Sequence, residues 1–189
     1  MKTLKNQALS YLKPLNKIKI ITLLLFLMQM LVFGQEKSVD SLRLEEVFPV
    51  FFPLLLEDFL GVSSKYGYRK HPILDKVYKH DGIDLVALKG KPVIATANGV
   101  VEKVDYHKGY GNRVVIKHRG KIKTLYAHLI KKNVIEGQKV KYGDVIGNVG
   151  DTGMVTGPHL HYEILFDNVK IDPMIFWKLV LKRNKIVKK

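Results

Sequence analysis

Between residues 61 and about 172, short apolar runs alternate with polar positions and are separated by glycine-containing turns. The apolar runs lie at 92–97, 100–106, 112–118, 122–127, 145–149 and 159–166. Several short strands with turn signals at this spacing are typical of an all-β sandwich or barrel-like sheet. No long amphipathic helical pattern interrupts the series, so a parallel βαβ arrangement is not expected. We therefore predict an antiparallel β-sandwich or half-barrel of short strands.

The C-terminal residues change from a strand pattern to a helical one. After Pro173, the sequence Met-Ile-Phe-Trp-Lys-Leu-Val-Leu predicts one short helix. We place the folded domain at residues 61–177. Residues 178–189 are rich in lysine and are expected to form a solvated basic tail.

Residues 35–60 have the composition of a connecting segment. Their first part predicts a short helix with Ser38 or Ser41 as its N-cap. The later part is strongly apolar and holds two prolines, at positions 49 and 53. We expect it to pack on the main domain as a strap, and contact with a membrane surface is the alternative. The sequence leaves open whether residues 47–60 cover the active site.

Residues 1–34 have the pattern of a targeting segment. Five lysines and no acidic residue accompany an apolar run at 20–33, which is broken only by Thr22 and Gln29. That run suits the core of a signal peptide and is shorter than the ~20 residues a membrane span needs. Small residues before Gln35 favour cleavage, and an uncleaved membrane anchor through 20–33 is the alternative. In both cases the remainder is exported to the periplasm or cell envelope, because positive charge stays inside.

Composition limits the chemistry that is open to the chain. Its 189 residues suit one modest domain with extra segments at the ends, and it contains no cysteine. A thiolate zinc site and a cysteine nucleophile are therefore excluded, so any metal must be held by His, Asp or Glu. The net charge of +15 indicates an anionic partner such as an envelope polymer or membrane surface. Nucleic acid is not favoured, because no segment interleaves basic and aromatic residues.

Two groups of histidines and carboxylates are candidates for a metal site. His159 and His161 alternate on a predicted strand, so both rings face one side with backbones about 6.5 Å apart. His80 and Asp84 flank Gly82, and an extended chain would separate them by about 13 Å. Glycine permits a bend that brings them closer.

His128 is a third candidate, on a different predicted strand. It follows Thr124 and Tyr126 at strand spacing, which predicts that all three share one face. A lone histidine in this setting is more often structural than catalytic.

Taken together, five motifs in fixed order form a specific pattern. They are Gly67-Tyr-Arg-Lys-His-Pro72, His80-Asp-Gly-Ile-Asp84, Tyr110-Gly-Asn112, Tyr126-Ala-His-Leu129 and Thr152-Gly-Met-Val-Thr-Gly-Pro-His-Leu-His161. This pattern resembles the lysostaphin-type (LytM-like) zinc peptidoglycan endopeptidases. The resemblance extends from about Ser63 to Pro173 and implies their all-β fold.

The resemblance also implies a role for each matching residue. His80, Asp84 and His161 match the ligands of one zinc ion per chain, and His128 and His159 match two active-site histidines outside the metal shell. Arg69, Tyr126 and Asn112 are candidate substrate contacts. A surface role is the alternative for Arg69, and a structural role is the alternative for Tyr126. The implied substrate is a peptide cross-link of peptidoglycan, either a glycine bridge or a D-Ala to diaminopimelate bond. Met154 and Val155 depart from the family's usual small polar residues and are expected to alter the groove.

Two histidines and one carboxylate leave a fourth zinc position for water, as in catalytic zinc sites. The chain lacks the glutamate of a zincin helix, so a histidine must act as base, and the sequence does not distinguish His128 from His159. The oligomeric state and any need for a protein activator are also open. One alternative is a catalytically silent wall-binding or regulatory module on the same fold. A carrier domain is a second alternative, because residues 136–147 resemble a lipoyl-carrier half-repeat, but no Met-Lys turn follows and an export signal does not suit it.

Overall fold

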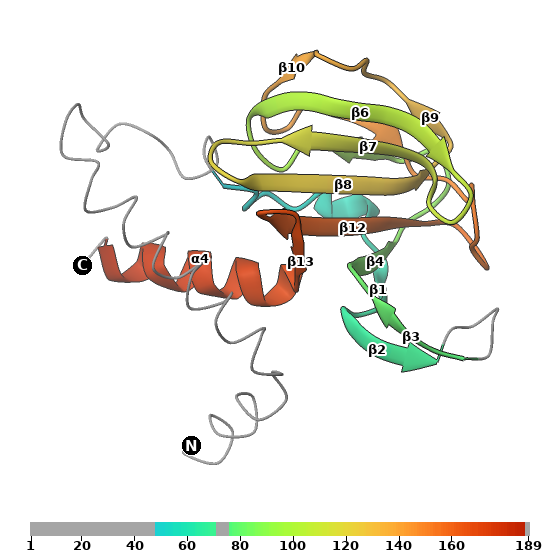
Figure 1. Cartoon of the computed structure of the whole chain (residues 1–189), viewed down its shortest axis with the longest axis horizontal. Helices are drawn as coiled ribbons and strands as arrows, with labels where there is room; N and C mark the ends of the chain where they lie inside the picture. Colours follow the sequence, from blue (N-terminus) through green and yellow to red (C-terminus); the bar gives the residue numbers. More distant parts are fainter. Residues whose placement is uncertain (1–47, 71–75, 188–189) are drawn as a thin grey trace. The chain divides into compact units, whose positions relative to one another are not determined.

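The computed structural model describes residues 48–70 and 76–187 (Figure 1). The targeting segment and the capped helix predicted at Ser38 or Ser41 lie outside these residues. In the described ranges, no helix combines the length and apolarity needed to cross a membrane. The elements in chain order are η3 (Leu56–Asp58), β1 (Gly61–Ser64), β2 (Gly67–Lys70), β3 (Val77–His80), β4 (Ile83–Val86), β5 (Pro92–Ile94), β6 (Gly99–His107), β7 (Gly111–Lys117), β8 (Ile122–Leu129), β9 (Lys131–Lys132), β10 (Lys139–Val140), β11 (Val145–Asn148), β12 (His159–Phe166), β13 (Val169–Ile171) and α4 (Pro173–Val187).

One large antiparallel sheet organises the domain (Figure 1). Its strand order is β1-β4-β12-β8-β7-β6-β10, with β13 paired to β12. A second sheet has the order β5-β11-β9, and β2 and β3 form a separate hairpin. The all-β prediction is confirmed. Strands β6, β7 and β8 pair in sequence order, whereas β12 enters from far along the chain and lies between β4 and β8.

The large sheet has one face directed into the core. Tyr126 of β8 and Tyr162 of β12 are paired neighbours on this face, and both side chains are fully buried. Their hydroxyl oxygens lie 2.9 Å and 3.0 Å from Oγ1 of Thr96, which follows β5. Burying two phenols is costly unless their hydroxyls are hydrogen-bonded, and Thr96 meets this need. Alternation along β12 therefore places His159 and His161 on the opposite face.

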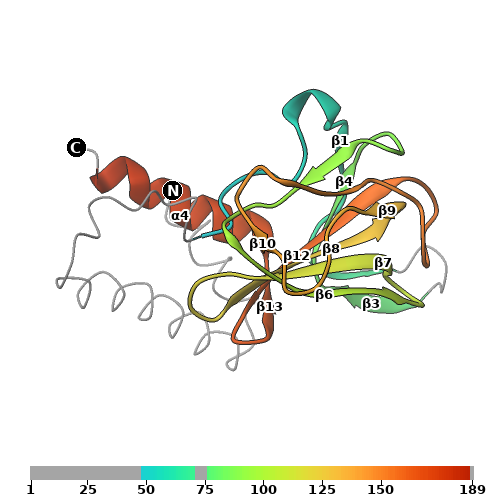
Figure 2. The ribbon, with the colours of Figure 1, turned by 90° about the horizontal axis from the view of Figure 1, so that it is seen from above.

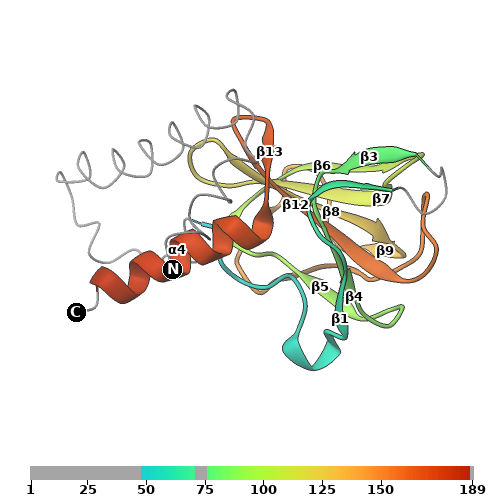
Figure 3. The same ribbon diagram turned by 90° about the horizontal axis from the view of Figure 1, so that it is seen from below.

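The apolar strap before β1 packs on the domain, as predicted. Leu54 is 2% exposed and bridges to Val93, and the ring of Phe52 lies 5.7 Å from that of Trp177 in α4. The indole Nε1 of Trp177 donates a 2.9 Å hydrogen bond to the carbonyl of Pro49. In Figure 3 the strap passes beside α4 before it reaches η3, and Figure 2 shows η3 next to the edge strand β1.

Helix α4 is longer than predicted. It begins at Pro173, a favoured first helical residue, and Asp172 Oδ1 accepts hydrogen bonds from the backbone of Met174 and Ile175. It continues to Val187, through most of the segment predicted as a tail. The domain boundary at residue 177 stays a prediction. Residues 178–187 contain no glycine or proline that would end a helix, so the helix continues through this basic segment.

Candidate active site

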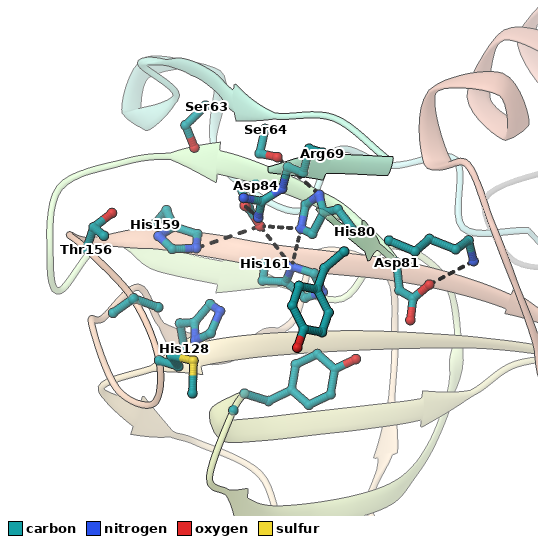
Figure 4. A pocket seen from close by; sticks show the side chains of 16 residues that line it. Ser63, Ser64, Arg69, His80, Asp81, Asp84, His128, Thr156, His159 and His161 are labelled. Atoms are coloured by element: carbon teal, nitrogen blue, oxygen red, sulfur yellow. Dashed lines mark hydrogen bonds and ion pairs between the residues drawn. The ribbon is translucent and has the colours of Figure 1, made fainter. Parts of the chain in front are cut away.

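The position of β12 brings the two predicted ligand groups together. His161 pairs with Asp84 of β4 on one side and with Ala127 of β8 on the other. Residues directly opposite in an antiparallel pair share a face, so Asp84 and His161 meet on the face away from the core. His80 ends β3 and reaches the same point (Figure 4).

The three predicted ligands form a compact, buried cluster. His80 Nε2 lies 3.0 Å from Asp84 Oδ1 and 3.0 Å from His161 Nδ1, and the latter lies 2.8 Å from Asp84 Oδ1. Two ligand atoms held ~2.0 Å from a tetrahedral zinc ion are ~3.3 Å apart, so small movements would admit the metal. Among the described residues, this is the one group of three or more such side chains with metal-binding geometry.

Hydrogen bonds on the far side of each imidazole leave the inner nitrogen free for a metal. His80 Nδ1 lies 2.9 Å from the carbonyl oxygen of Lys65, and His161 Nε2 lies 3.0 Å from Glu163 Oε1. A carbonyl or carboxylate oxygen only accepts, so each of these nitrogens carries a proton. Nε2 of His80 can then present a lone pair to the centre of the cluster, and Nδ1 of His161 can do so once the proton that it shares with Asp84 is lost. Metal-binding histidines are oriented in this way, so the residues present fit zinc.

The electrostatics of the cluster favour a cation. Burial opposes the charge on His161, but hydrogen bonds to Asp84 and Glu163 outweigh it and raise the pKa of His161 to about 9. Burial also opposes ionisation of Asp84, yet the hydrogen bonds from His161 and His80 hold the pKa of Asp84 far below its ordinary value. A positive charge between the two carboxylates is thus stabilised, and zinc would displace a proton from His161.

Gly82 allows the segment from His80 to Asp84 to lie close to β12. A Cβ on Gly82 would overlap the carbonyl oxygen of Tyr162 and approach Glu163 Cγ to 2.9 Å and His161 Cε1 to 3.0 Å. The glycine was predicted to permit a bend. In the structure it lies in the turn between β3 and β4 and allows this turn to approach β12 closely.

The variant Gly82→Ala is therefore expected to lose zinc affinity and about 1–3 kcal/mol of stability, because the added methyl pushes β12 away from the ligand turn. Zinc competition titration and urea unfolding measure the two effects. Gly157→Ala is the matched control for zinc affinity, since a Cβ there meets open space. Equal zinc affinity in Gly82→Ala and the wild type would contradict this role of the close approach.

His128 and His159 lie beside the metal cluster in the same pocket (Figure 4). Their ring centroids are 4.8 Å apart. His159 Nδ1 lies 2.8 Å from the carbonyl of Gly157, and His128 Nδ1 lies 2.8 Å from that of Thr152. Both Nδ1 atoms are therefore donors and both Nε2 atoms are left free, with His159 Nε2 3.7 Å from Asp84 Oδ1. Burial, together with the charges of His161 and His159, lowers the pKa of His128 to about 4.

His128 does not share a face with Thr124 and Tyr126, so that prediction was wrong. The pairing of β7 with β8 shifts register here, with Asn112 opposite Leu129 and Val114 opposite Tyr126. The extra residue on β8 is a β-bulge, and His128 within it has φ +63°. Bulges redirect side chains, and this one turns His128 from the core face to the pocket.

The three candidate substrate contacts have different positions. Arg69 lines the pocket, with Nη2 3.4 Å from Asp84 Oδ2. Tyr126 is fully buried in the core and cannot contact a substrate. Asn112 is not among the pocket-lining residues. Its Nδ2 donates to the carbonyl of Leu129, and its backbone N–H donates to Thr152 Oγ1, so it supports the loop whose carbonyl holds His128. Tyr126 therefore has a structural role, and the substrate contact of Asn112 stays a prediction.

The pocket is an open cavity of about 570 Å³. Met154 and Val155 line it, so the departure noted in the sequence does face the groove. The described part of the strap, residues 48–60, contributes none of the lining residues. The sequence pattern predicts no role for Glu163 or Lys170, and Tyr110 occurs there only as part of a motif. All three lie directly behind His161.

The fold and the site define a class of β-sheet hydrolase with a single-metal centre of two histidines and one aspartate. The family model described as "Peptidase family M23" matches residues 78–173. The chain belongs to this family.

Named relatives and solved structures agree with this assignment. The chain is 48% identical over 116 residues to the DD-carboxypeptidase/endopeptidase Mpg of Neisseria meningitidis and 44% identical over 117 residues to the peptidoglycan DD-endopeptidase ShyC of Vibrio cholerae, covering 61% of this chain and 27% of each relative. The chain thus spans about a quarter of the length of these curated relatives.

Two structures share the fold. A zinc-containing peptidase from Vibrio cholerae has a TM-score of 0.63 and 40% identity, with 69% of this chain and 40% of that chain covered. The catalytic domain of lysostaphin from Staphylococcus simulans has a TM-score of 0.58 and 32% identity, with 62% and 92% covered. The family, the zinc-containing neighbour and the fit of His80, Asp84 and His161 agree on zinc as the cofactor.

Proposed function

We propose that this protein is a zinc metalloendopeptidase that hydrolyses peptide cross-links of peptidoglycan. The observation that carries the proposal is the arrangement of four histidines around Asp84. Two present a free nitrogen to the metal position, and two present a free Nε2 to the adjoining pocket. A structural zinc site is closed by four protein ligands, whereas this cluster offers three and has two further histidines beside it.

His80, Asp84 and His161 would hold the metal, which when bound polarises the scissile carbonyl and makes water a stronger acid. The Nε2 atoms of His128 and His159 would then handle the protons. One accepts a proton as water attacks the carbonyl and returns it to the amine nitrogen as the C–N bond breaks. The other would need a second proton, at Nε2, and in that imidazolium form it would donate a hydrogen bond to the developing oxyanion. Arg69 at the pocket wall would orient the peptide.

The substrate assignment is supported by the relatives. Mpg is named a DD-carboxypeptidase/endopeptidase, and ShyC is named a peptidoglycan DD-endopeptidase. We therefore propose the D-Ala to diaminopimelate bond as the one that is cut. We also propose that the apolar run at residues 20–33 acts as an export signal or a membrane anchor. Export to the periplasm or cell envelope would bring the protein to a peptidoglycan substrate.

Zinc-loaded protein is expected to release cross-link-derived muropeptides from purified peptidoglycan, and a chelator should stop the release. Mass spectrometry of the soluble fragments identifies the bond, and re-addition of zinc should restore activity. If zinc-loaded protein binds peptidoglycan in a sedimentation assay but releases no fragments, the chain is instead the silent wall-binding module. The complete ligand set argues against that second candidate.

A further inference from the structure

Glu163 is a buried carboxylate behind the metal cluster. It lies two residues after His161 on β12, on the same face, and its side chain has no solvent exposure. Its Oε1 accepts hydrogen bonds from Tyr110 Oη at 2.6 Å, His161 Nε2 at 3.0 Å and Lys170 Nζ at 3.2 Å. A buried charge is costly unless it is paired and hydrogen-bonded. The three partners of Glu163 meet this requirement, so the fold is arranged to hold a carboxylate here.

The partners of Glu163 come from separate parts of the fold. Tyr110 lies in the turn between β6 and β7, and Lys170 lies on β13. Lys170 Nζ also donates to Tyr110 Oη at 2.8 Å and to Asp81 Oδ2 at 3.0 Å, and Asp81 lies in the ligand turn beside His80. The network therefore joins the ligand turn to the rear of His161.

Tyr110 connects this network to the second histidine pair. Its carbonyl oxygen accepts the backbone N–H of His128 at 2.8 Å, and its ring lies 5.4 Å from the ring of His161. One residue thus supports both a candidate ligand and a candidate proton carrier. Movement of Tyr110 would disturb both.

We propose that Glu163 is a positioning residue that holds His161 with Nδ1 toward the metal, and that Tyr110 and Lys170 hold Glu163 in place. The inference deepens the proposed function, on whose metal site it rests. A neutral imidazole can carry its proton on either nitrogen, and the ring of a histidine can rotate about the χ2 angle. The carboxylate fixes the proton at Nε2 and fixes the ring plane, so that His161 meets zinc without reorganisation.

The carboxylate oxygens are used unequally, which allows a sharp test. All three contacts fall on Oε1, and Oε2 is buried with no hydrogen-bond partner among the described residues. Glu163→Gln can keep an acceptor at the Oε1 position but loses the charge that pairs with Lys170. Glu163→Leu removes the acceptor and fills a similar volume.

The experiment measures zinc affinity of the full chain by competition with a chromophoric chelator, without substrate. Glu163→Leu is expected to bind zinc about 10–100-fold more weakly than the wild type, the range for outer-shell partners of metal ligands. Glu163→Gln should fall between the two, and Tyr110→Phe should also weaken binding. Cobalt-loaded variants should show altered visible absorption, because the ligand geometry changes. Glu102→Gln, an exposed carboxylate paired with Lys123, is the matched control and should match the wild type.

Folding of each metal-free variant is checked by circular dichroism. A folded Glu163→Leu with wild-type zinc affinity and an unchanged cobalt spectrum overturns the proposal, even if its thermal stability is reduced. If Glu163→Leu does not fold, the zinc affinity of Glu163→Gln is the deciding measurement. A zinc affinity of Glu163→Gln equal to that of the wild type overturns the proposal. Failure of the proposed function would give a different result. The zinc-loaded wild type would then leave peptidoglycan intact, while the variants would still show the expected differences in zinc affinity.

Discussion

Replacing His161 with alanine is expected to abolish both zinc binding and peptidoglycan cleavage. His161 is one of the three candidate ligands that the described residues offer, and the remaining pair of His80 and Asp84 would hold zinc weakly. We expect zinc affinity to fall by more than about 100-fold, beyond the effect of an outer-shell change. Cleavage should fall by at least ~10³-fold, because the metal contributes several kcal/mol of charge stabilisation. Chelator competition and fragment release measure the two losses.

His118→Ala separates loss of metal from loss of stability. His118 is also buried, and its ring nitrogens lie 2.8 Å from the carbonyl of Asn98 and 2.8 Å from Thr124 Oγ1. It is not a pocket-lining residue. Its removal should lower thermal stability but leave the affinity for zinc unchanged. A His161→Ala protein that binds zinc as tightly as the wild type would refute the ligand assignment.

The parts of the site that the sequence predicted are those set by local pattern. Strand alternation places His159 and His161 on one face, and the structure has them so. The ligand set was implied by the resemblance of the ordered motifs to a known family, and the structure brings His80, Asp84 and His161 together. Strand periodicity and glycine turns likewise predicted the all-β fold, because these signals act within a few residues.

The parts that were missed depend on contacts between distant segments. Glu163 is an ordinary strand residue in the sequence, and only β13 and the β6–β7 turn make it the centre of a network. The face of His128 was wrong because a bulge depends on the pairing of two strands, which alternation along one strand does not encode. Gly82 was expected to act by local flexibility, but its closest neighbour is Tyr162, 80 positions later.

Tyr126 and Asn112 show that a motif alone does not give the role of each of its residues. Each lies in a motif beside a functional residue, so each was considered a substrate contact. The structure places the ring of Tyr126 against Thr96 in the core and the amide of Asn112 on the backbone of Leu129. A motif marks residues that the site requires, but it does not separate those that touch substrate from those that hold the scaffold.

Replacing His128 with alanine is expected to abolish cleavage while zinc binding stays near the wild-type level. His128 Nδ1 is held by the carbonyl of Thr152, which leaves Nε2 to exchange protons in the pocket. Loss of a general acid–base group costs about 10²–10⁴-fold in rate. Fragment release should fall by this factor, and chelator competition should show an unchanged affinity. Loss of zinc from the folded variant would instead make His128 a ligand and break the division between the two histidine pairs.

The backbone of His128 offers a second variant that separates catalysis from stability. With φ +63°, alanine keeps the strain of the left-handed conformation, whereas glycine adopts it without steric cost. His128→Gly should therefore be more stable than His128→Ala by up to about 1 kcal/mol, as measured by urea unfolding. Both should be equally inactive if the imidazole carries the proton. Recovery of activity in the glycine variant would show that His128 acts through the shape of the bulge. Equal inactivity in a more stable protein would leave the Nε2 atom as the feature that the reaction requires.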